Sequence, residues 1–277
     1  VDDLRPELNC YGATHILSPN IDRLASAGMM FESAYCQVPV CGASRASLLT
    51  GLRPARDRFL RYDTWAEKDA PGIPSLPAYL KANGYYTLSN GKVFHHREDL
   101  KESWSETPWH PAMEVKGTNL WRDYQRPEHI EIALAHNGSG PAYEYLAGHD
   151  TLYFDGKIAE KSLHDLERLK DRGQPFFLAA GFLKPHLPFN APATYWDAYD
   201  PSMIQLPENR EAPEHAPPAS LHNWGELRAY YGIPEEGPLP DSLARKLIHG
   251  YYACVSYTDA QIGKLLDQLE ALDLDKN

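Results

Sequence analysis

The stretch Phe176-Phe-Leu-Ala-Ala-Gly-Phe182 is an unbroken apolar run with the length of one strand, and Lys184-Pro-His186 follows it closely. An apolar run without polar alternation is typical of a strand buried on both faces, in a sheet that helices cover. The preceding residues Lys157–Leu169 carry apolar side chains at helical spacing. A helix that leads into such a strand predicts an α/β fold, with a mixed, largely parallel central sheet flanked by helices.

Other segments predict further elements of this fold. Tyr85–Ser89 and Met29–Tyr35 each have the composition and length of a strand. Cys41 is expected at the N-terminus of a short helix, because Gly51 follows ten residues later as a typical helix C-terminal glycine. The proline-rich stretch Pro201–Pro240 predicts a long ordered loop, of the kind that often shapes a binding site. Two more short helices are predicted at Ser18–Gly28 and Ser75–Gly84.

The composition excludes several classes of protein. With 27 Lys and Arg against 38 Asp and Glu, the formal net charge of −11 opposes a general nucleic-acid binder. The longest apolar stretch, Phe176–Leu183, is too short to cross a bilayer, which excludes a transmembrane segment. Four cysteines in 277 residues, without a CxxC pair, make neither a disulfide framework nor a zinc ribbon. The lack of a GxGxxG motif removes a dinucleotide site.

Both ends of the sequence indicate a longer domain. The chain starts at Val1 without an initiator Met, a signal peptide or another targeting segment. It stops at Asn277, soon after a helical pattern at Gln261–Leu269 that would normally lead into another strand. We therefore expect residues 1–277 to be the N-terminal part of one domain, incomplete because a first strand and a C-terminal part are missing.

Polar residues follow the probable strands. Asp2-Asp3 opens the chain, Lys92 and His95 come after the strand at 85–89, and Lys184 and His186 come after the strand at 176–182. Ligands of open α/β sheets bind outside the carboxyl ends of the strands, and so these side chains are expected in one crevice. Carboxylates suit Ca²⁺ or Mg²⁺, lysines suit a sulfate or phosphate, and histidines transfer protons near neutral pH. The combination predicts hydrolysis of an anionic ester.

Each feature alone has a simpler explanation. An Asp-Asp pair is most often a solvated turn, and a cysteine that opens a helix is more often a small buried residue than a reactive one. Lys92 and His95 could be surface residues, and the prolines around His186 could mark a rigid turn. No single motif among these decides the function.

The segment around Cys41 changes that balance. Cys41-Gly-Ala-Ser-Arg-Ala-Ser-Leu-Leu-Thr-Gly51 resembles the signature of the type I sulfatases, in which the cysteine is oxidised to Cα-formylglycine by the formylglycine-generating enzyme. Ala43 stands where proline is commoner, which is a recognised variant. The resemblance implies the alkaline phosphatase and sulfatase superfamily fold, and a catalytic domain over residues 1–277. Further stretches are similar to the iduronate-2-sulfatase branch: Val1–Pro6, Ser18–Leu24, Gly91–His95, Phe177–Phe189 and Tyr251–Asp259.

The resemblance implies a role for each candidate residue. Asp2, Asp3 and an oxygen on the modified Cys41 would hold a divalent cation, Ca²⁺ or Mg²⁺. Arg45 would fix the gem-diol of the hydrated aldehyde, one oxygen of which attacks sulfur. Lys92, Lys184 and His186 would bind the substrate, and His186 would also donate a proton to the departing alcohol. His95 would help the second hydroxyl of the diol to expel sulfate, a step that an unmodified thiol cannot perform.

The resemblance also implies a biological setting. The substrate would be a sulfated saccharide, with a 2-O-sulfated uronic acid at a glycan end as the leading candidate, and so a role in glycosaminoglycan degradation. The compartment would be periplasmic, secreted or lysosomal. Because two carboxylates and one diol oxygen fall short of the six to eight oxygens that Ca²⁺ prefers, we expect residues 1–277 alone to bind metal poorly and to be inactive. A C-terminal chain that completes the fold would restore activity.

Three alternatives stay open at this point. A phosphate or phosphonate monoester hydrolase of the same superfamily could use the same nucleophile. A protein that binds sulfated glycans without catalysis would result if Cys41 stays unmodified. A cysteine hydrolase that pairs Cys41 with His186 is the weakest, because it gives Asp2-Asp3 and Lys92 no purpose.

Overall fold

The computed structural model describes residues 1–111 and 122–276. The chain forms two compact units. The first comprises Val1–Pro111, Phe154–Leu183 and Thr258–Asn277, and the second comprises Ala112–Tyr153 and Lys184–Tyr257. Both units contain a parallel pair of strands with helices beside it, which confirms the predicted α/β class.

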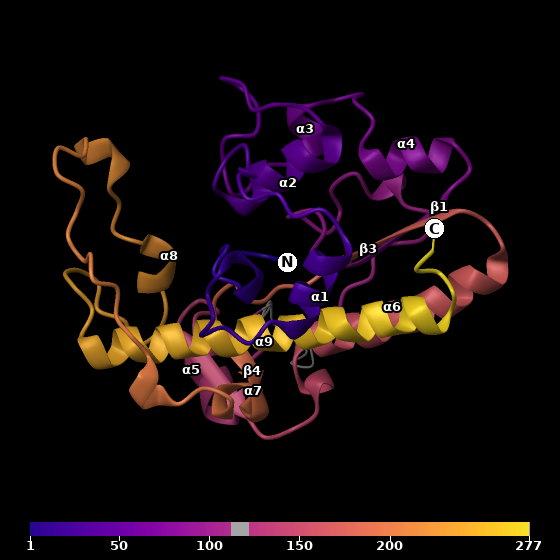
Figure 1. Ribbon diagram of the computed structural model, residues 1–277. Coiled ribbons are helices and arrows are strands. Elements are labelled where there is room, and N and C mark those ends of the chain that lie inside the picture. The colour runs from indigo at the N-terminus through magenta and orange to yellow at the C-terminus, as the bar shows by residue number, and fades with distance from the viewer. Residues whose placement is uncertain (112–121, 277) are drawn as a thin grey trace. The chain divides into compact units, whose positions relative to one another are not determined.

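The first unit contains the two strands that the sequence predicts best. β1 (Tyr86–Gly91) pairs in parallel with β3 (Phe176–Gly181), with Tyr86 opposite Phe176 and Gly91 opposite Gly181 (Figure 1). The connection contains α6 (Phe154–Arg172), which packs against both strands and confirms the predicted helix. The expected burial of β3 on both faces is wrong, because five of its six residues are only partly buried. Within the described residues β3 has one neighbouring strand, and so its other edge is not covered by a sheet.

The strand predicted at Met29–Tyr35 is also wrong. These residues form an irregular loop, and Met29, Phe31 and Tyr35 are 82%, 67% and 86% exposed. A strand needs a neighbour to accept and donate its backbone hydrogen bonds, and among the described residues none pairs with this segment. The composition of residues 29–35 favours an extended backbone, but it does not determine whether a neighbouring strand is present to pair with them.

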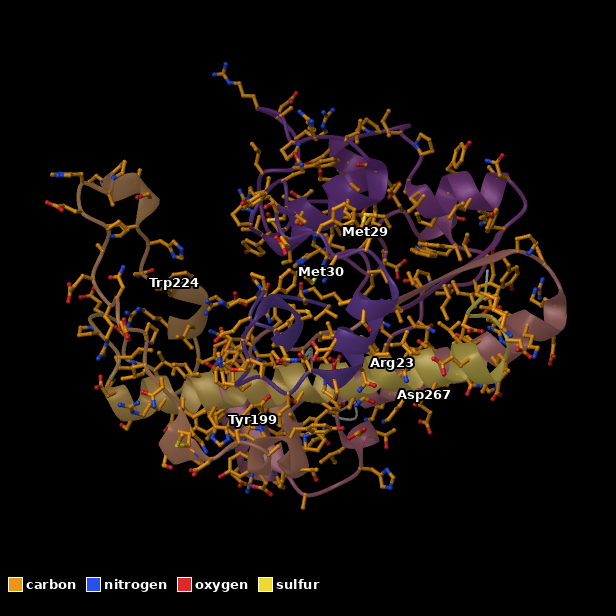
Figure 2. The ribbon with its side chains drawn as sticks, in the orientation of Figure 1. Arg23, Met29, Met30, Tyr199, Trp224 and Asp267 are labelled. Atoms are coloured by element: carbon orange, nitrogen blue, oxygen red, sulfur yellow. The ribbon has the colours of Figure 1, made fainter. Side chains whose placement is uncertain are left out.

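The predicted helix at Ser18–Gly28 is confirmed as α1 (Pro19–Ala27), which lies against the C-terminal part of α9 (Asp241–Ala271). The carboxylate of Asp259 on α9 accepts hydrogen bonds from the backbone N–H groups of Asn20 and Ile21, at 3.0 and 2.7 Å. These N–H groups belong to the first turn of α1 and have no partner within the helix. At the same contact, Arg23 Nη1 donates to Asp267 Oδ1 at 2.8 Å (Figure 2).

A buried ion cluster joins β1 to α6. Asp165 on α6 has a side chain that is 1% exposed and accepts from Lys161, from Asn90 Nδ2 on β1 at 2.9 Å and from Arg168 Nη2 at 2.9 Å. Burial alone would raise the pKa of Asp165, but these hydrogen bonds outweigh burial and lower the pKa. Asp165 therefore holds a charge that two cations and one amide satisfy.

Replacing Asp165 by asparagine is expected to lower the free energy of unfolding by about 2 kcal/mol, because Lys161 loses its buried counter-charge, whereas Arg168 is partly exposed and keeps its hydrogen bonds to Glu106. Asp171→Asn on the exposed side of the same helix removes the same charge and should change stability by less than about 0.5 kcal/mol. Urea unfolding of the whole protein measures both values. Equal effects of the two substitutions would contradict the assigned role of the cluster.

The second unit is built on a second parallel pair of strands. β2 (Tyr143–Leu146) pairs with β4 (Phe189–Pro192), and an aromatic cluster that includes Tyr153, Trp196 and Tyr257 packs beside it. The stretch predicted as a long loop is irregular for most of its length, with three short helices: η4 (Pro201–Met203), η5 (Pro218–Ser220) and α8 (Gly225–Arg228).

Short helices make up the rest of the described structure. The predicted helix at Ser75–Gly84 is confirmed as α4 (Leu76–Ala82), and Ser75 Oγ accepts from Ala78 N at its start. No helix among the described residues is long and apolar enough to cross a membrane. The remaining elements are η1 (Asn9–Tyr11), α2 (Cys41–Thr50), α3 (Ala66–Asp69), η2 (Lys101–Ser103), α5 (Pro127–Ala135), η3 (Asp150–Leu152) and α7 (Ala193–Asp197).

Candidate active site

Cys41 is the first residue of α2, as the sequence predicts, and Gly51 ends this helix in the left-handed conformation with φ 70°. Val40 before it is extended, so that the backbone turns into the helix at the cysteine. Gly42 is required here, because a Cβ at this position would overlap the backbone carbonyl of Tyr62. This close approach holds the start of α2 against the chain at residues 61–62.

Asp2, Arg45 and Lys92 form an ion cluster beside the start of α2. Arg45 lies one turn after Cys41, and its Nη2 donates to Asp2 Oδ1 at 2.8 Å while the ammonium of Lys92 donates to Asp2 Oδ2. Arg45 Nη1 also donates to the carbonyls of Lys92 and Val93, at 2.6 and 2.9 Å. The side chain of Asp2 is 4% exposed, and those of Arg45 and Lys92 are each 15% exposed. The sequence places these three residues far apart, and the first unit brings them together.

The end of β1 positions Lys92. Gly91 has φ 75°, a conformation that glycine adopts without strain, and turns the chain at this point. Lys92 N donates to Gly181 O at 2.8 Å, and a Cβ at Gly181 would overlap the backbone of Lys92. The last residue of β3 must therefore be glycine for Lys92 to reach the ion cluster. Sequence reasoning missed Gly181, which appeared only as one small residue in an apolar run.

His95 contacts the thiol of Cys41. The distance from His95 Nδ1 to Cys41 Sγ is 3.3 Å. Burial and the positive charge of Lys92 lower the pKa of His95 to about 4, so the imidazole is neutral at pH 7 and can accept a proton. Burial raises the pKa of the Cys41 thiol, against the opposing effect of Lys92. The unmodified cysteine is therefore a protonated thiol at neutral pH and a poor nucleophile.

Asp2 and Asp3 have the hard oxygen atoms that Ca²⁺ and Mg²⁺ prefer, but they do not complete a cation site. Both oxygens of Asp2 accept from Arg45 and Lys92, and Asp3 is exposed, with φ 56°. Among residues 1–111 and 122–276, no group of three or more His, Cys, Asp or Glu side chains is gathered closely enough to hold a metal ion. The carboxylate oxygens of Asp2 and Asp3 are suitable ligands for such an ion, but two carboxylates are too few to hold it.

Lys184 and His186 belong to the second unit and lie in the turn between β3 and β4. Lys184 is 4% exposed, and its ammonium donates to the carbonyls of His186 at 3.0 Å and Pro188 at 2.7 Å. In this structure the lysine holds the turn together, and its predicted contact with substrate stays a prediction. His186 Nδ1 lies 2.6 Å from Leu187 O, and its Nε2 lies 3.2 Å from Glu226 Oε1 on α8. Sequence reasoning missed Glu226, for which the long proline-rich loop was the only signal.

The comparisons with known proteins agree along the whole chain. A family model described as "Sulfatase" matches residues 1–277. The sequence is 36% identical to the iduronate 2-sulfatase of Homo sapiens over 99% of this chain and 51% of that protein. It is 34% identical to the iduronate 2-sulfatase of Mus musculus over 100% of this chain and 51% of that protein. The chain thus spans about half the length of the curated relatives it matches.

Solved structures share the fold at much lower identity. The crystal structure of a phosphonate monoester hydrolase of Agrobacterium radiobacter superimposes with a TM-score of 0.68 at 20% identity, covering 99% of this chain and 58% of that chain. Identity at this level supports the fold and carries no information on the reaction.

Proposed function

The chain belongs to the sulfatase family, and we propose that the whole protein hydrolyses sulfate esters through Cys41 after its oxidation to Cα-formylglycine. The observation that carries this proposal is the arrangement at the start of α2, where His95 contacts Cys41 and an Asp2–Arg45–Lys92 cluster lies beside them. The resemblance of Cys41–Gly51 to the sulfatase signature supports the oxidation. Residues 1–277 are then the N-terminal part of the catalytic domain.

The proposed reaction has two steps. In the first, a hydroxyl of the hydrated aldehyde at residue 41 loses its proton to solvent and its oxygen forms a bond to sulfur, the bond between sulfur and the ester oxygen breaks, and the alcohol leaves with a proton from His186. In the second, the other hydroxyl loses its proton to neutral His95, the bond from carbon to the sulfated oxygen breaks, and sulfate leaves as the aldehyde re-forms. Water then restores the diol, His95 returns its proton to solvent and His186 is reprotonated, so that the sum is one ester plus one water giving one alcohol, one sulfate dianion and one proton.

The cations of the cluster suit the charge that this reaction develops. Arg45 and Lys92 are 15% exposed, and so their charges are screened less than those of surface residues. Arg45 is anchored to two carbonyls, which fixes its guanidinium near residue 41, and Lys92 is proposed to contact the sulfate oxygens. A cation in this position stabilises negative charge without moving as the reaction proceeds.

His186 is proposed to donate the proton to the departing alcohol. Its Nδ1 lies 2.6 Å from Leu187 O, and its Nε2, which lies 3.2 Å from Glu226 Oε1, is the atom proposed to donate. Lys184 supports this role by holding the turn, and its own contact with substrate belongs to the same proposal.

Asp2 and Asp3 are proposed as the first ligands of a divalent cation, Ca²⁺ or Mg²⁺, together with an oxygen on residue 41. The family generally uses such an ion, which acts as a Lewis acid toward the reacting oxygens when it is bound. The ligands that these residues do not supply would come from elsewhere in the whole protein.

The proposed substrate is a sulfated saccharide with a 2-O-sulfated uronic acid, which fits the two curated relatives named iduronate 2-sulfatase. A role in glycosaminoglycan degradation, a periplasmic, secreted or lysosomal compartment and modification by the formylglycine-generating enzyme belong to the same proposal. A phosphate or phosphonate monoester hydrolase of the same superfamily is the second candidate, because it could use the same nucleophile at residue 41.

The test compares two esters with the same alcohol. The whole protein, produced together with the formylglycine-generating enzyme, is expected to hydrolyse an aryl sulfate at least about tenfold faster than the matching aryl phosphate. A 2-O-sulfated uronate disaccharide should release sulfate as well. Faster turnover of the phosphate would establish the second candidate, and turnover of neither ester would refute both.

A further inference from the structure

A pocket of about 380 Å³ lies in the first unit, in the segment that joins α2 to α3. Its volume falls in the lower part of the range for small-molecule sites, about 300–1,000 Å³. The lining consists mainly of charged and polar residues, with Trp65 as the large aromatic member that is partly exposed. The lining residues are Asp57–Arg61, Asp63–Trp65, Lys68 and Asp69.

The wall of this pocket is continuous with the contacts around Cys41. Trp65 stacks on His96 with ring centroids 4.2 Å apart, and His96 Nε2 lies 3.0 Å from Asp63 O. The ring of His96 meets that of His95 edge to face at 4.8 Å, and His95 contacts the thiol of Cys41. One pair of histidines therefore separates the proposed nucleophile from the aromatic wall of the pocket.

Most charges of the pocket already have partners. Arg61 Nε and Nη2 donate to the two carboxylate oxygens of Asp63, at 3.0 and 3.2 Å. Asp69 accepts from Phe59 N at 2.9 Å, and Arg58 donates to the carbonyl of Arg53. Lys68 differs, because its ammonium has neither a carboxylate nor a carbonyl partner within the described chain and lies over the Trp65 ring, 4.2 Å from the centroid. The pocket thus presents one exposed ammonium that is held in place by an aromatic ring.

This chemistry matches an acidic sugar ring better than an apolar ligand. A sugar has hydroxyl groups around its edge, which can pair with the donors and acceptors of the lining. Its carboxylate or sulfate can pair with the Lys68 ammonium. An apolar ligand would remove water from the Lys68 ammonium without giving it a partner, at a high cost in free energy.

We propose that the pocket at residues 57–69 binds a sugar ring next to the one that carries the scissile sulfate, with Lys68 contacting the carboxylate or sulfate of that ring. The proposal rests on the proposed sulfatase function, and it adds a subsite outside the residues that take part in the reaction. The subsite gives the exposed ammonium of Lys68 a role in binding an anionic saccharide to a chain that is acidic as a whole.

The test uses Lys68→Gln in the whole protein, because Lys68 is exposed and the glutamine removes the charge with the loss of only one atom of side-chain length. Its ratio of kcat/KM for a sulfated uronate disaccharide over kcat/KM for a small aryl sulfate is expected to fall about tenfold, since one charge-assisted contact is lost. Lys68→Arg should restore most of the ratio. Lys170→Gln, which removes an exposed charge from α6, is the matched control and should leave the ratio unchanged.

Direct binding separates this proposal from the proposed function. Calorimetric titration with the disaccharide should give an affinity about tenfold weaker for Lys68→Gln than for the unchanged protein. The change in tryptophan fluorescence on binding should be smaller in Trp65→Phe. If no sulfate ester is hydrolysed but binding depends on Lys68, the proposed function fails and the subsite stands. Equal affinity and an equal kcat/KM ratio for Lys68→Gln and the unchanged protein would overturn the subsite, even if sulfate is released normally.

Discussion

Replacing Cys41 by alanine in the whole protein is expected to lower the hydrolysis of sulfate esters by at least about 10⁴-fold, since loss of the nucleophile in a serine hydrolase costs about 10⁶-fold in kcat. The proposed reaction forms its covalent bond at residue 41, and alanine offers neither an aldehyde nor a hydroxyl. The remaining groups around the site, Arg45, Lys92 and His95, would still bind the sulfate. The loss is therefore expected in kcat, with a much smaller change in KM.

Cys36→Ala provides the matched control. Cys36 is exposed, lies five residues before Cys41 in the loop, and should be dispensable for turnover. Peptide mass spectrometry of the unchanged protein should find residue 41 lighter than cysteine, as expected for an aldehyde, and Cys36 unmodified. Full turnover by a protein whose residue 41 is intact cysteine would contradict the mechanism.

The state of the Cys41 thiol argues against a simple cysteine hydrolase. A cysteine at a helix N-terminus is expected to have a lowered pKa, because the helix dipole favours the thiolate. Here burial is the larger effect and raises the pKa of Cys41, while His95 beside it has a pKa of about 4 and does not become an imidazolium near neutral pH. A thiolate–imidazolium pair does not form under these conditions. The proposed oxidation to an aldehyde would make residue 41 reactive without a thiolate.

The strands and helices that the sequence predicts correctly are those with local signals. The apolar run of β3, the capping residue of α4 and the glycine after α2 each mark an element within a few residues. Met29–Tyr35 and the burial of β3 depend instead on which strands lie alongside. Neighbours of a strand are not encoded in its own composition, and so these two predictions were wrong.

For the candidate site too, some features could be predicted from the sequence and others appear only in the folded structure. The rule that ligands bind at the ends of parallel strands predicted that Asp2, Lys92 and His95 lie in one crevice, and the structure shows a contact of Lys92 with Asp2 and of His95 with Cys41. It did not reveal that Asp2 is neutralised by Arg45 and Lys92, nor that Gly181 must be small for Lys92 to approach. Those features come from side-chain packing between segments that are 43 to 90 residues apart in the sequence.

Replacing Asp2 by asparagine is expected to have the largest effect on stability, a loss of about 3 kcal/mol in the free energy of unfolding. Asp2 is the buried counter-ion of both Arg45 and Lys92. An asparagine has the same shape but no charge, and so the two cations would repel each other in a site that water reaches poorly. The measurement is urea unfolding of the whole protein in a buffer with a chelator, which keeps any bound divalent ion out of the comparison.

Asp3→Asn separates the structural role from the catalytic one. Asp3 is exposed, and asparagine adopts its left-handed conformation readily, and so the expected loss of stability is below about 1 kcal/mol. Both residues are proposed cation ligands, and both substitutions should therefore lower sulfate release by at least about 10²-fold. Asp2→Asn should lose stability and turnover together, whereas Asp3→Asn should lose turnover alone. If Asp3→Asn retains full turnover, Asp3 is not a ligand; if Asp2→Asn is as stable as the unchanged protein, the ion cluster does not hold the start of α2 in place.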